Sequence, residues 1–291
     1  MRAERENIIY LPGVALPDAV RITHDPDELR DCSHYIIATP TQFVRSVIAS
    51  FDSRALRNAV IINVAKGIEV SSLKRISEIV AETLDFPMER YVALSGPSHA
   101  EEVGHGMPTV VVAASGSDEL ARETQRLFSS PAFRVYSSRD VTGVELGGAL
   151  KNIIALSAGI CDGAGFGDNA KAALMTRGVA EISRLGAALG ANAATFAGLS
   201  GLGDLIVTCA SRHSRNRHVG EEIGKGRLLK DILAEMKMVA EGVATTQSAH
   251  ALALRTGVEM PIVSEVHQIL FEGKNPLEAT RTLMLREMKE E

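Results

Sequence analysis

The strongest constraint on the fold is a change in the periodicity of apolar residues part-way along the chain. Short, continuous apolar runs bounded by turn formers occur in the first half, at residues 35–38, 60–64, 91–94 and 109–113. Runs of this kind are typical of strands that are buried on both faces of a parallel sheet. Stretches with helical periodicity fall between some of them, at residues 71–84 and 119–128. This alternation predicts a doubly wound α/β domain.

After about Arg139 the strand-like runs stop and helical periodicity dominates. The helical stretches cover residues 144–160, 170–189, 228–238, 245–255, 262–271 and 276–289. Asn275 followed by Pro276 is a typical helix start, because proline is favoured at the first helical position. We therefore expect two domains: an α/β domain over residues 1–139 and an all-helical domain over residues 140–291.

Composition narrows the function classes. The chain has 291 residues, of which 45% are hydrophobic, so it can bury a sizeable core. Its net charge of −5 argues against a nucleic-acid-binding surface, which needs a concentrated basic face. No stretch approaches the ~18–20 apolar residues that span a bilayer, and the N-terminal residues lack the apolar region of a secretory signal. The three cysteines lie far apart, and together these features favour a cytoplasmic protein.

An α/β domain of this kind commonly binds a dinucleotide through a GxGxxG turn between its first strand and helix. Two glycine clusters come close, at residues 163–167 and 201–204, but neither follows a strand. The first is followed by Asp168, whose charge would repel a phosphate. We interpret both clusters as helix stops or tight turns, since glycine is enriched just past helix ends. The chain thus has the alternation of strands and helices that is typical of a Rossmann-like domain, without the opening βαβ unit.

One predicted helix, residues 144–160, is apolar nearly all round yet contains Lys151. Such a helix is buried, and we expect it between the two domains, with Gly147 and Gly148 allowing a neighbour to pack closely. A lysine there either extends its ammonium group to water or has a function that justifies its desolvation. Desolvation lowers the pKa of a lysine, as an acid/base group working near neutral pH requires.

Other polar residues occur at positions that suit ligands. Lys66 ends an apolar run, and the carboxyl ends of strands are where open α/β sheets bind ligands. Residues 95–98, Ser-Gly-Pro-Ser, offer backbone N–H groups and hydroxyls after the next run. Asp204 lies in a glycine turn, and Arg215 belongs to a Ser-Arg-Asn-Arg cluster whose guanidinium suits a phosphate. Each also has an ordinary explanation: a lysine leaving the sheet, a turn, a helix cap and a solvated charge run.

His213 and His218 lie beside this cluster. Their His-x4-His spacing does not place both rings on one helix face, and no cysteine or acidic ligand accompanies them. We therefore expect surface histidines and no metal.

Four segments, taken in their order along the chain, resemble the motifs of bacterial NAD(P)-dependent glycerol-3-phosphate dehydrogenases. They are Val-Ala-Lys-Gly at 64–67, Leu-Ser-Gly-Pro-Ser-His-Ala at 94–100, Glu-Leu-Gly-Gly-Ala-Leu-Lys-Asn at 145–152, and Gly-Leu-Gly-Asp at 201–204 with Ser-Arg-Asn-Arg at 214–217. Stretches at 10–13, 176–178 and 258–262 support the resemblance, which extends from about residue 4 to 286. It implies an incomplete Rossmann-like domain followed by a helical substrate and dimerisation domain of the 6-phosphogluconate-dehydrogenase-like type, and hence a homodimer.

The resemblance also implies an activity: hydride transfer between NAD(P)H and dihydroxyacetone phosphate, which supplies sn-glycerol 3-phosphate for glycerophospholipid synthesis. Lys151 is implied as the catalytic acid/base, with Asp204 orienting its ammonium group or the substrate hydroxyls. The implied substrate site comprises Lys66, Gly96, Ser98, Lys151, Asn152, Asp204, Thr208, Ser214, Arg215 and Asn216. Among these, Lys66, Arg215 and Asn216 are implied to hold the phosphate. The implied contacts to NAD or NADP are Lys66, Ala100, Arg215, Val239 and Glu241.

The sequence departs from the family pattern at its start, because the family opens with a strand, a GxGxxG-like turn, a helix and a second strand. That first strand would lie beside residues 35–38, so its loss exposes an unpaired apolar edge and removes the amides that bind the pyrophosphate. We expect the gene product to begin upstream of Met1. The alternatives are a shortened chain with weakened cofactor binding, a non-enzymatic remnant, or a related β-hydroxyacid dehydrogenase acting on a carboxylate. The residues that distinguish NAD from NADP cannot be read from this sequence.

Overall fold

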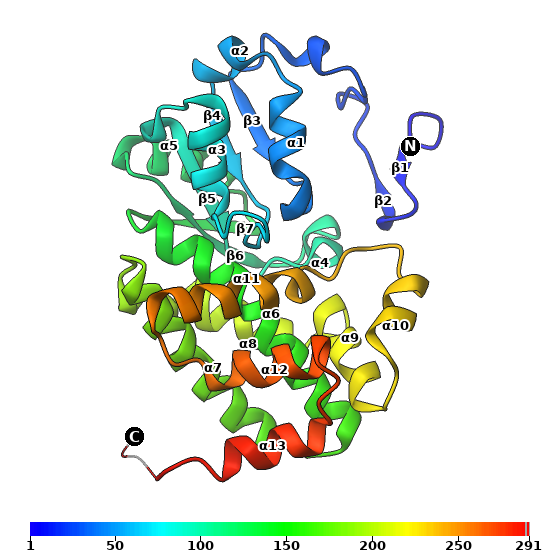
Figure 1. Ribbon diagram of the computed structural model, residues 1–291. Helices are drawn as coiled ribbons and strands as arrows, with labels where there is room; N and C mark the ends of the chain where they lie inside the picture. Colours follow the sequence, from blue (N-terminus) through cyan, green and yellow to red (C-terminus); the bar gives the residue numbers. More distant parts are fainter. Residues whose placement is uncertain (289, 291) are drawn as a thin grey trace.

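The computed structural model describes residues 1–288 and Glu290. Figure 1 shows two halves, one above the other: an α/β half from the N-terminal part of the chain and a helical half from the C-terminal part. The last strand, β7, ends at Ser138, and the long helix α6 begins at Val141. We propose this short connection as the boundary between the two domains.

The N-terminal half contains one five-stranded sheet and a separate two-stranded hairpin. Its strands are β1 (Glu6–Asn7), β2 (Leu11–Ala15), β3 (His34–Ile37), β4 (Val60–Asn63), β5 (Tyr91–Ser95), β6 (Thr109–Ala114) and β7 (Phe133–Ser138). Its helices are η1 (Pro26–Leu29), η2 (Thr41–Phe43), α1 (Val44–Ala49), α2 (Ser53–Arg57), α3 (Ile76–Leu84), η3 (Met88–Arg90), α4 (Ala100–Gly104) and α5 (Asp118–Phe128). The four apolar runs form strands and the two intervening helical stretches contain α3 and α5, as the sequence predicts.

The sheet is mixed, which corrects the prediction of a parallel sheet. Its strand order is β3-β4-β5-β6-β7, and every neighbouring pair is parallel except β5 and β6, which are antiparallel. The reason lies in the connection between these two strands. The five-residue helix α4 stays at the carboxyl end of β5 instead of crossing the face of the sheet, so the chain enters β6 from that end.

The two edges of the sheet differ in how well the sequence predicts them. At one edge lies β7, which was not predicted as a strand. Its residues alternate, so that Val135 is buried while Tyr136 is 45% exposed, whereas the prediction was based on continuous apolar runs. At the other edge, β3 pairs only with β4 among the described strands, and Ile36 is 55% exposed. The unpaired apolar edge that the sequence predicts beside residues 35–38 is therefore confirmed.

The C-terminal half is all helical. Its elements are α6 (Val141–Ala164), α7 (Asp168–Ala188), η4 (Ala193–Ala197), η5 (Leu199–Gly203), α8 (Asp204–Ala210), α9 (Arg215–Gly224), α10 (Leu229–Glu235), α11 (Glu241–Thr256), α12 (Pro261–Phe271) and α13 (Pro276–Met284). The last helix begins at Pro276 as predicted, whereas its predicted end, Lys289, lies outside the described residues.

The two glycine clusters behave differently. Gly165 ends α6 with a φ of +73°, a left-handed conformation that favours glycine, so the first cluster is a helix stop as predicted. The second cluster is not a stop, because Gly201 and Gly203 belong to the π-helical turn η5, which continues directly into α8. A Cβ atom at Gly201 would overlap the backbone of Phe196, which explains the need for glycine there.

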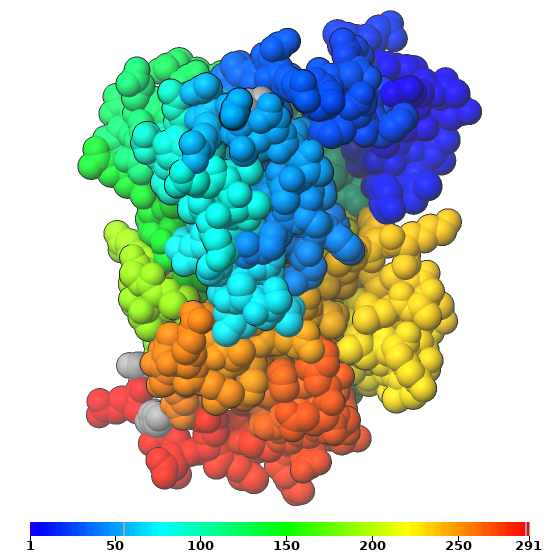
Figure 2. Space-filling model, turned by 45° about the horizontal axis from the view of Figure 1, so that its top comes forward, coloured from blue at the N-terminus to red at the C-terminus, as the bar shows by residue number. Residues whose placement is uncertain are grey.

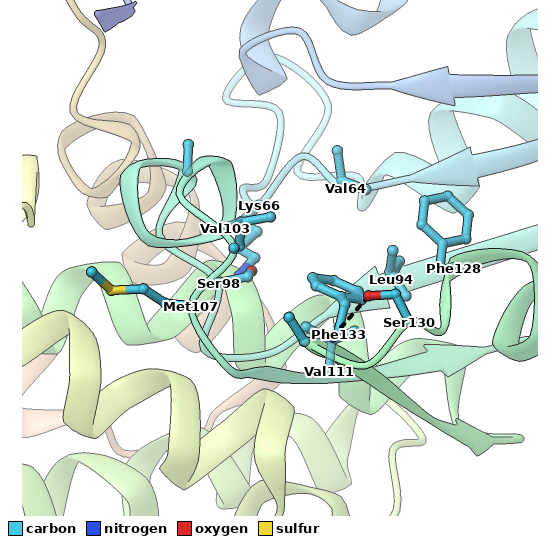
Figure 3. Close-up of a pocket in the computed structure, with 13 residues that line it drawn as sticks. Val64, Lys66, Leu94, Ser98, Val103, Met107, Val111, Phe128, Ser130 and Phe133 are labelled. Carbon is cyan, nitrogen blue, oxygen red and sulfur yellow. Dashed lines mark hydrogen bonds between the residues drawn. The ribbon is translucent and has the colours of Figure 1, made fainter. Parts of the chain in front are cut away.

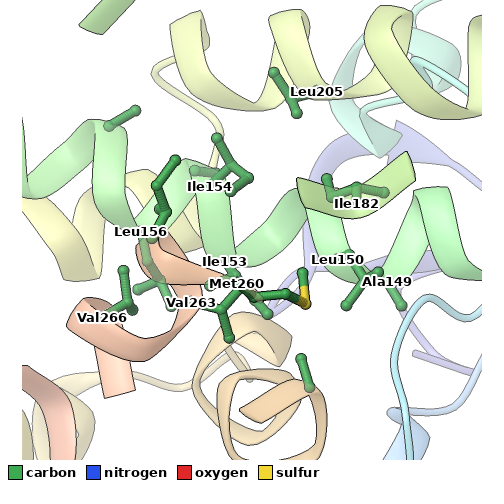
Figure 4. Close-up of a cluster of buried hydrophobic side chains, with 14 of the residues drawn as sticks. Ala149, Leu150, Ile153, Ile154, Leu156, Ile182, Leu205, Met260, Val263 and Val266 are labelled. Carbon is green, nitrogen blue, oxygen red and sulfur yellow. The ribbon is translucent and has the colours of Figure 1, made fainter. Parts of the chain in front are cut away.

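Helix α6 is the centre of the C-terminal core. Every residue from Gly143 to Cys161 is buried, and the helix packs against α7, α8, α9, α11 and α12 as well as β5. Figure 4 shows its apolar side chains among those of the surrounding helices, with the labelled residues Ala149, Leu150, Ile153, Ile154, Leu156, Ile182, Leu205, Met260, Val263 and Val266. Burial of this helix between the two domains is therefore confirmed.

The same helix corrects the expectation that no stretch approaches the length of a membrane span. By length and composition alone, α6 is long and apolar enough to cross a membrane, with a mean hydropathy of 1.3 over 18 residues. However, 89% of that window is buried inside the protein. α6 thus has the surroundings of a core helix.

Helices α6 and α9 pack through what we call the glycine seam: Gly159 and Gly163 of α6 with Gly220 and Gly224 of α9. At each of these positions a Cβ atom would overlap backbone atoms of the opposite helix. At Gly224, for example, it would lie 2.5 Å from the carbonyl oxygen of Ile160. The two backbones are therefore in direct contact, which fixes the spacing and register of the two helices.

Candidate active site

A cavity of about 720 Å³ lies where the two domains meet. Its walls come from segments that follow β3, β4 and β5 and from α6, α8, α9 and α11, together with parts of the N-terminal segment. Figure 2 shows the N-terminal segment (blue) next to the region of α9 and α10 (yellow) on this side of the molecule. The carboxyl ends of strands at a domain junction are where open α/β sheets bind ligands.

Nearly every residue proposed from the sequence lines this cavity. Those that line it are Lys66, Ser98, Ala100, Lys151, Asn152, Thr208, Ser214, Arg215, Asn216, Val239 and Glu241. The other two, Gly96 and Asp204, lie directly behind the wall, where both bind lysines that line the cavity. The structure therefore brings together residues that are up to 175 positions apart in the sequence, from Lys66 to Glu241.

Two lysines share one buried carboxylate. Lys151 Nζ donates to Asp204 Oδ1 and to Thr208 Oγ1, each at 2.6 Å. Lys66 Nζ donates to Asp204 Oδ2 at 2.6 Å and to the carbonyl oxygen of Gly96 at 2.9 Å. Lys151 and Asp204 are only 6% and 1% exposed. Asp204 therefore orients two ammonium groups, and its side chain does not cap α8.

Burial and charge set the protonation of this cluster. The pKa of Lys151 is lowered from 10.5 to about 8: desolvation is the main cause and the charge of Lys66 adds to it, whereas the charge of Asp204 opposes the change. Burial alone would raise the pKa of Asp204, but the charges of Lys151 and Lys66 outweigh burial and hold that pKa below its ordinary value. Lys151 can therefore lose and regain a proton near neutral pH beside a fixed negative charge, as a general acid/base must.

A chain of amide hydrogen bonds connects α6, α9 and α11 around the cavity. Asn152 follows Lys151 on α6, and its Oδ1 accepts from Asn216 Nδ2 at 2.9 Å. Asn216 Oδ1 in turn accepts from the backbone N–H of Gly242 at 2.9 Å. Both ends of the Asn216 amide thus engage the protein, so this side chain holds three helices in register. Its predicted contact with a phosphate stays a prediction.

Arg215 is the first residue of α9, and its exposed side chain lines the cavity. The preceding Ser214 is the N-cap, whose Oγ accepts from the backbone N–H of Arg217. Arg217 itself forms an ion pair with Asp162 at 2.6 Å. Arg215 therefore offers its guanidinium to the cavity next to the positive end of a helix dipole, an arrangement that suits an anionic group.

The sheet side of the cavity suits a polar cofactor. Thr39 Oγ1, just after β3, is buried without a hydrogen-bond partner. Glu241 Oε1 accepts from the backbone N–H of Thr41 at 2.7 Å, and Val239 lines the same wall with 41% exposure. A buried polar group without a partner costs free energy unless a ligand satisfies it. The unpaired hydroxyl and the carboxylate at this wall fit a polar cofactor such as a nicotinamide dinucleotide.

An apolar hollow of about 470 Å³ adjoins this cavity and shares Val64, Lys66, Ser98 and Ala100 with it. Figure 3 shows Lys66 and Ser98 on one side of the hollow and the rings of Phe128 and Phe133 on the other. Because its far wall is apolar, the hollow offers few groups for polar chemistry, and the larger cavity is the better candidate for the reacting site.

Sequence reasoning missed two histidines of the cavity. His99 and His213 both line it, with ring centroids 6.2 Å apart. His213 is half-buried, which corrects the expectation of a surface residue, while His218 is exposed as predicted. His99 lies within the 94–100 motif, so the sequence held a signal for it. Within residues 1–288 and 290, no group of three or more His, Cys, Asp or Glu side chains is placed to hold a metal.

Comparison with known proteins decides the family. Residues 1–121 match the family model for the NAD-dependent glycerol-3-phosphate dehydrogenase N-terminus, and residues 140–281 match that for the C-terminus. A protein of Chlorobium phaeobacteroides (strain BS1) named glycerol-3-phosphate dehydrogenase [NAD(P)+] is 51% identical over the whole chain and 88% of its own length. This chain belongs to the NAD-dependent glycerol-3-phosphate dehydrogenase family.

Further members of this family agree. A Pelotomaculum thermopropionicum protein, also named glycerol-3-phosphate dehydrogenase [NAD(P)+], is 55% identical over 97% of this chain and 81% of its own length. The crystal structure of glycerol-3-phosphate dehydrogenase from Coxiella burnetii is 35% identical and superposes with a TM-score of 0.92, covering 98% of this chain and 87% of that one. The glycerol-3-phosphate dehydrogenase family therefore accounts for the Rossmann-like domain and the helical domain.

Proposed function

We propose that this chain is an NAD(P)-dependent sn-glycerol-3-phosphate dehydrogenase that interconverts dihydroxyacetone phosphate and sn-glycerol 3-phosphate. The observation that carries the proposal is the ion cluster at the cavity wall, where Asp204 holds the buried ammonium of Lys151 at 2.6 Å. Family membership supports the phosphorylated three-carbon substrate over the carboxylate of a β-hydroxyacid. A bound nicotinamide cofactor supplies or accepts the hydride at C2 of the substrate.

In the reduction, Lys151 donates a proton to the C2 oxygen of dihydroxyacetone phosphate as that oxygen gains negative charge. Asp204 stabilises the ammonium form before transfer, and Thr208 fixes the direction of the amine. In the oxidation, the neutral amine of Lys151 takes the hydroxyl proton, which a pKa of about 8 permits near neutral pH. Proton transfer by a positioned group of this kind accelerates a reaction about 10²–10⁴-fold.

Arg215 and the start of α9 hold the substrate phosphate in this proposal, with Lys66 and Asn216 completing the site. Fixing the phosphate aligns the carbonyl group with Lys151, and alignment of this kind lowers a barrier by up to about 7–11 kcal/mol. The product, sn-glycerol 3-phosphate, is the backbone of glycerophospholipids, and we infer a role in supplying it. We further propose a cytoplasmic location, which the sequence composition favours, and a homodimer, which the family resemblance implies.

The decisive experiment replaces the proposed acid/base. Lys151→Ala should lower kcat by about 10²–10⁴-fold, and Lys151→Met should do the same while preserving more of the side-chain volume. Lys230→Ala, at an exposed lysine of α10, is the matched control and should keep full activity. NADH and NADPH fluorescence titrations should change little in any of the three variants, and thermal unfolding should show that each is folded. Turnover by Lys151→Ala within tenfold of the unmodified protein would refute the assignment.

A further inference from the structure

His99 is a half-buried residue of the cavity to which no role has been assigned. It lies in the loop between β5 and α4, directly before the first residue of α4, and lines the cavity together with Lys151. Its Nε2 is buried and has no hydrogen-bond partner, and the same is true of Ser95 Oγ at the end of β5. A native protein keeps an unpaired buried polar group rarely, and usually where a ligand, water or ion completes it.

The surroundings of His99 define what it can bind. Burial lowers its pKa, as does the charge of Lys151, while the carboxylates of Glu101, Asp204 and Glu102 oppose the change. The ring of His213 also lies near the ring of His99, with their centroids 6.2 Å apart. At neutral pH the ring is therefore uncharged, with one N–H donor and one nitrogen acceptor, which matches the hydrogen-bonding capacity of a hydroxyl group.

The charges around His99 favour a neutral hydroxyl over a phosphate as its partner. Glu101 lines the cavity beside His99 and would repel a phosphate dianion. Arg215, at the start of a different helix, offers the cation that a phosphate needs. Dihydroxyacetone phosphate has a phosphate on C3 and a free hydroxyl on C1, with the reacting carbonyl carbon between them. With C2 at Lys151 and the phosphate at Arg215, the C1 hydroxyl is left for the loop that contains His99.

We propose that His99 is a specificity-determining residue that hydrogen-bonds the C1 hydroxyl of the three-carbon substrate, an inference that rests on the proposed function. The bond selects a hydroxymethyl ketone phosphate over the corresponding methyl ketone phosphate. A site built to bond a hydroxyl rejects an analogue without it strongly, because the protein group is left buried and unpaired.

The test compares dihydroxyacetone phosphate with its 1-deoxy analogue, which has a methyl group in place of the hydroxymethyl group. The quantity measured is the ratio of kcat/KM for the two substrates. His99→Leu should lower this ratio about 10- to 100-fold, mainly by lowering kcat/KM for dihydroxyacetone phosphate. The KM for NADH or NADPH should not change. His218→Leu, at an exposed histidine of α9, is the control and should keep the ratio of the unmodified protein.

Two conservative variants guard against a purely structural effect. His99→Asn keeps an amide donor near the position of Nδ1, and His99→Gln keeps one near Nε2. Recovery of discrimination by either variant, with His99→Leu folded but unselective, supports the proposal and identifies the nitrogen involved. A ratio unchanged in His99→Leu overturns it, as does an effect confined to the KM of the cofactor. Failure of the proposed function would look different, because the unmodified protein would then reduce neither ketone phosphate.

Discussion

Removal of Lys66 should raise the pKa of Lys151, the proposed acid/base, by an amount that follows from the distance between the two ammonium groups. Opposite oxygens of Asp204 hold the ammonium groups of Lys66 and Lys151, each at 2.6 Å. The two charges are then roughly 6 Å apart, and at an effective dielectric constant of about 20 their repulsion is about 2–3 kcal/mol. One pH unit corresponds to about 1.4 kcal/mol. Because the Lys66 side chain is 19% exposed and partly screened by water, we expect Lys66→Met to raise the pKa of Lys151 by about 1–2 pH units.

The assay is the pH dependence of kcat for oxidation of sn-glycerol 3-phosphate, which requires the neutral amine. In the unmodified protein kcat should rise with pH through a midpoint near the Lys151 pKa of about 8. Lys66→Met should move that midpoint to higher pH. Asp204→Asn, which removes the negative charge between the two lysines, should move it to lower pH, provided that thermal unfolding shows a folded protein. Midpoints that stay in place, or that move in the same direction in both variants, would refute the electrostatic argument.

Two further predictions concern stability. Burial raises the pKa of Glu181 from 4.5 to about 7, so the folded state holds a proton that the unfolded state releases between these values. The free energy of unfolding should therefore fall by about 3 kcal/mol as pH rises through this window. Thermal unfolding measured across this pH range should show a smaller fall in Glu181→Gln. An equal dependence of stability on pH in the two proteins would contradict this prediction. Gly159→Ala places a methyl group against the Arg217 carbonyl and should cost about 3 kcal/mol or more, whereas Gly116→Ala, with open space around it, should not destabilise. Equal melting temperatures for the two alanine variants would show that the seam tolerates a side chain.

The fold was predictable where burial produces a continuous run of apolar residues in the sequence. Strands with continuous apolar runs, such as β4 and β5, and the fully buried helix α6 are of this kind. The direction of β6 was not predictable, because antiparallel pairing with β5 depends on where α4 lies in space and not on the residues of β6. The edge strand β7 was overlooked because its alternating pattern differs little from that of a loop.

The candidate site was predictable as a set of residues but not as a network. Family motifs identify Lys66, Lys151 and Asp204, yet nothing in the sequence says that both lysines bind one carboxylate across 138 and 53 positions. That contact depends on the packing of α8 against α6 at the domain junction. His99 was passed over because its motif gives no sign that one ring nitrogen is buried without a partner. Its missing hydrogen-bond partner becomes visible only in three dimensions.

The glycine seam has a consequence for substrate choice. Lys151 lies two helical turns before Gly159 on α6, and Arg215 lies less than two turns before Gly220 on α9. Since the two backbones touch, these helices cannot slide or separate to accommodate a longer molecule. In the proposed site, this contact therefore sets the distance between the amine of Lys151 and the guanidinium of Arg215. A ketone phosphate with an extra carbon between its carbonyl and its phosphate could then place its carbonyl at Lys151 or its phosphate at Arg215, but not both at once. Selection for substrate length would thus come from the glycine seam, which does not itself contact the substrate.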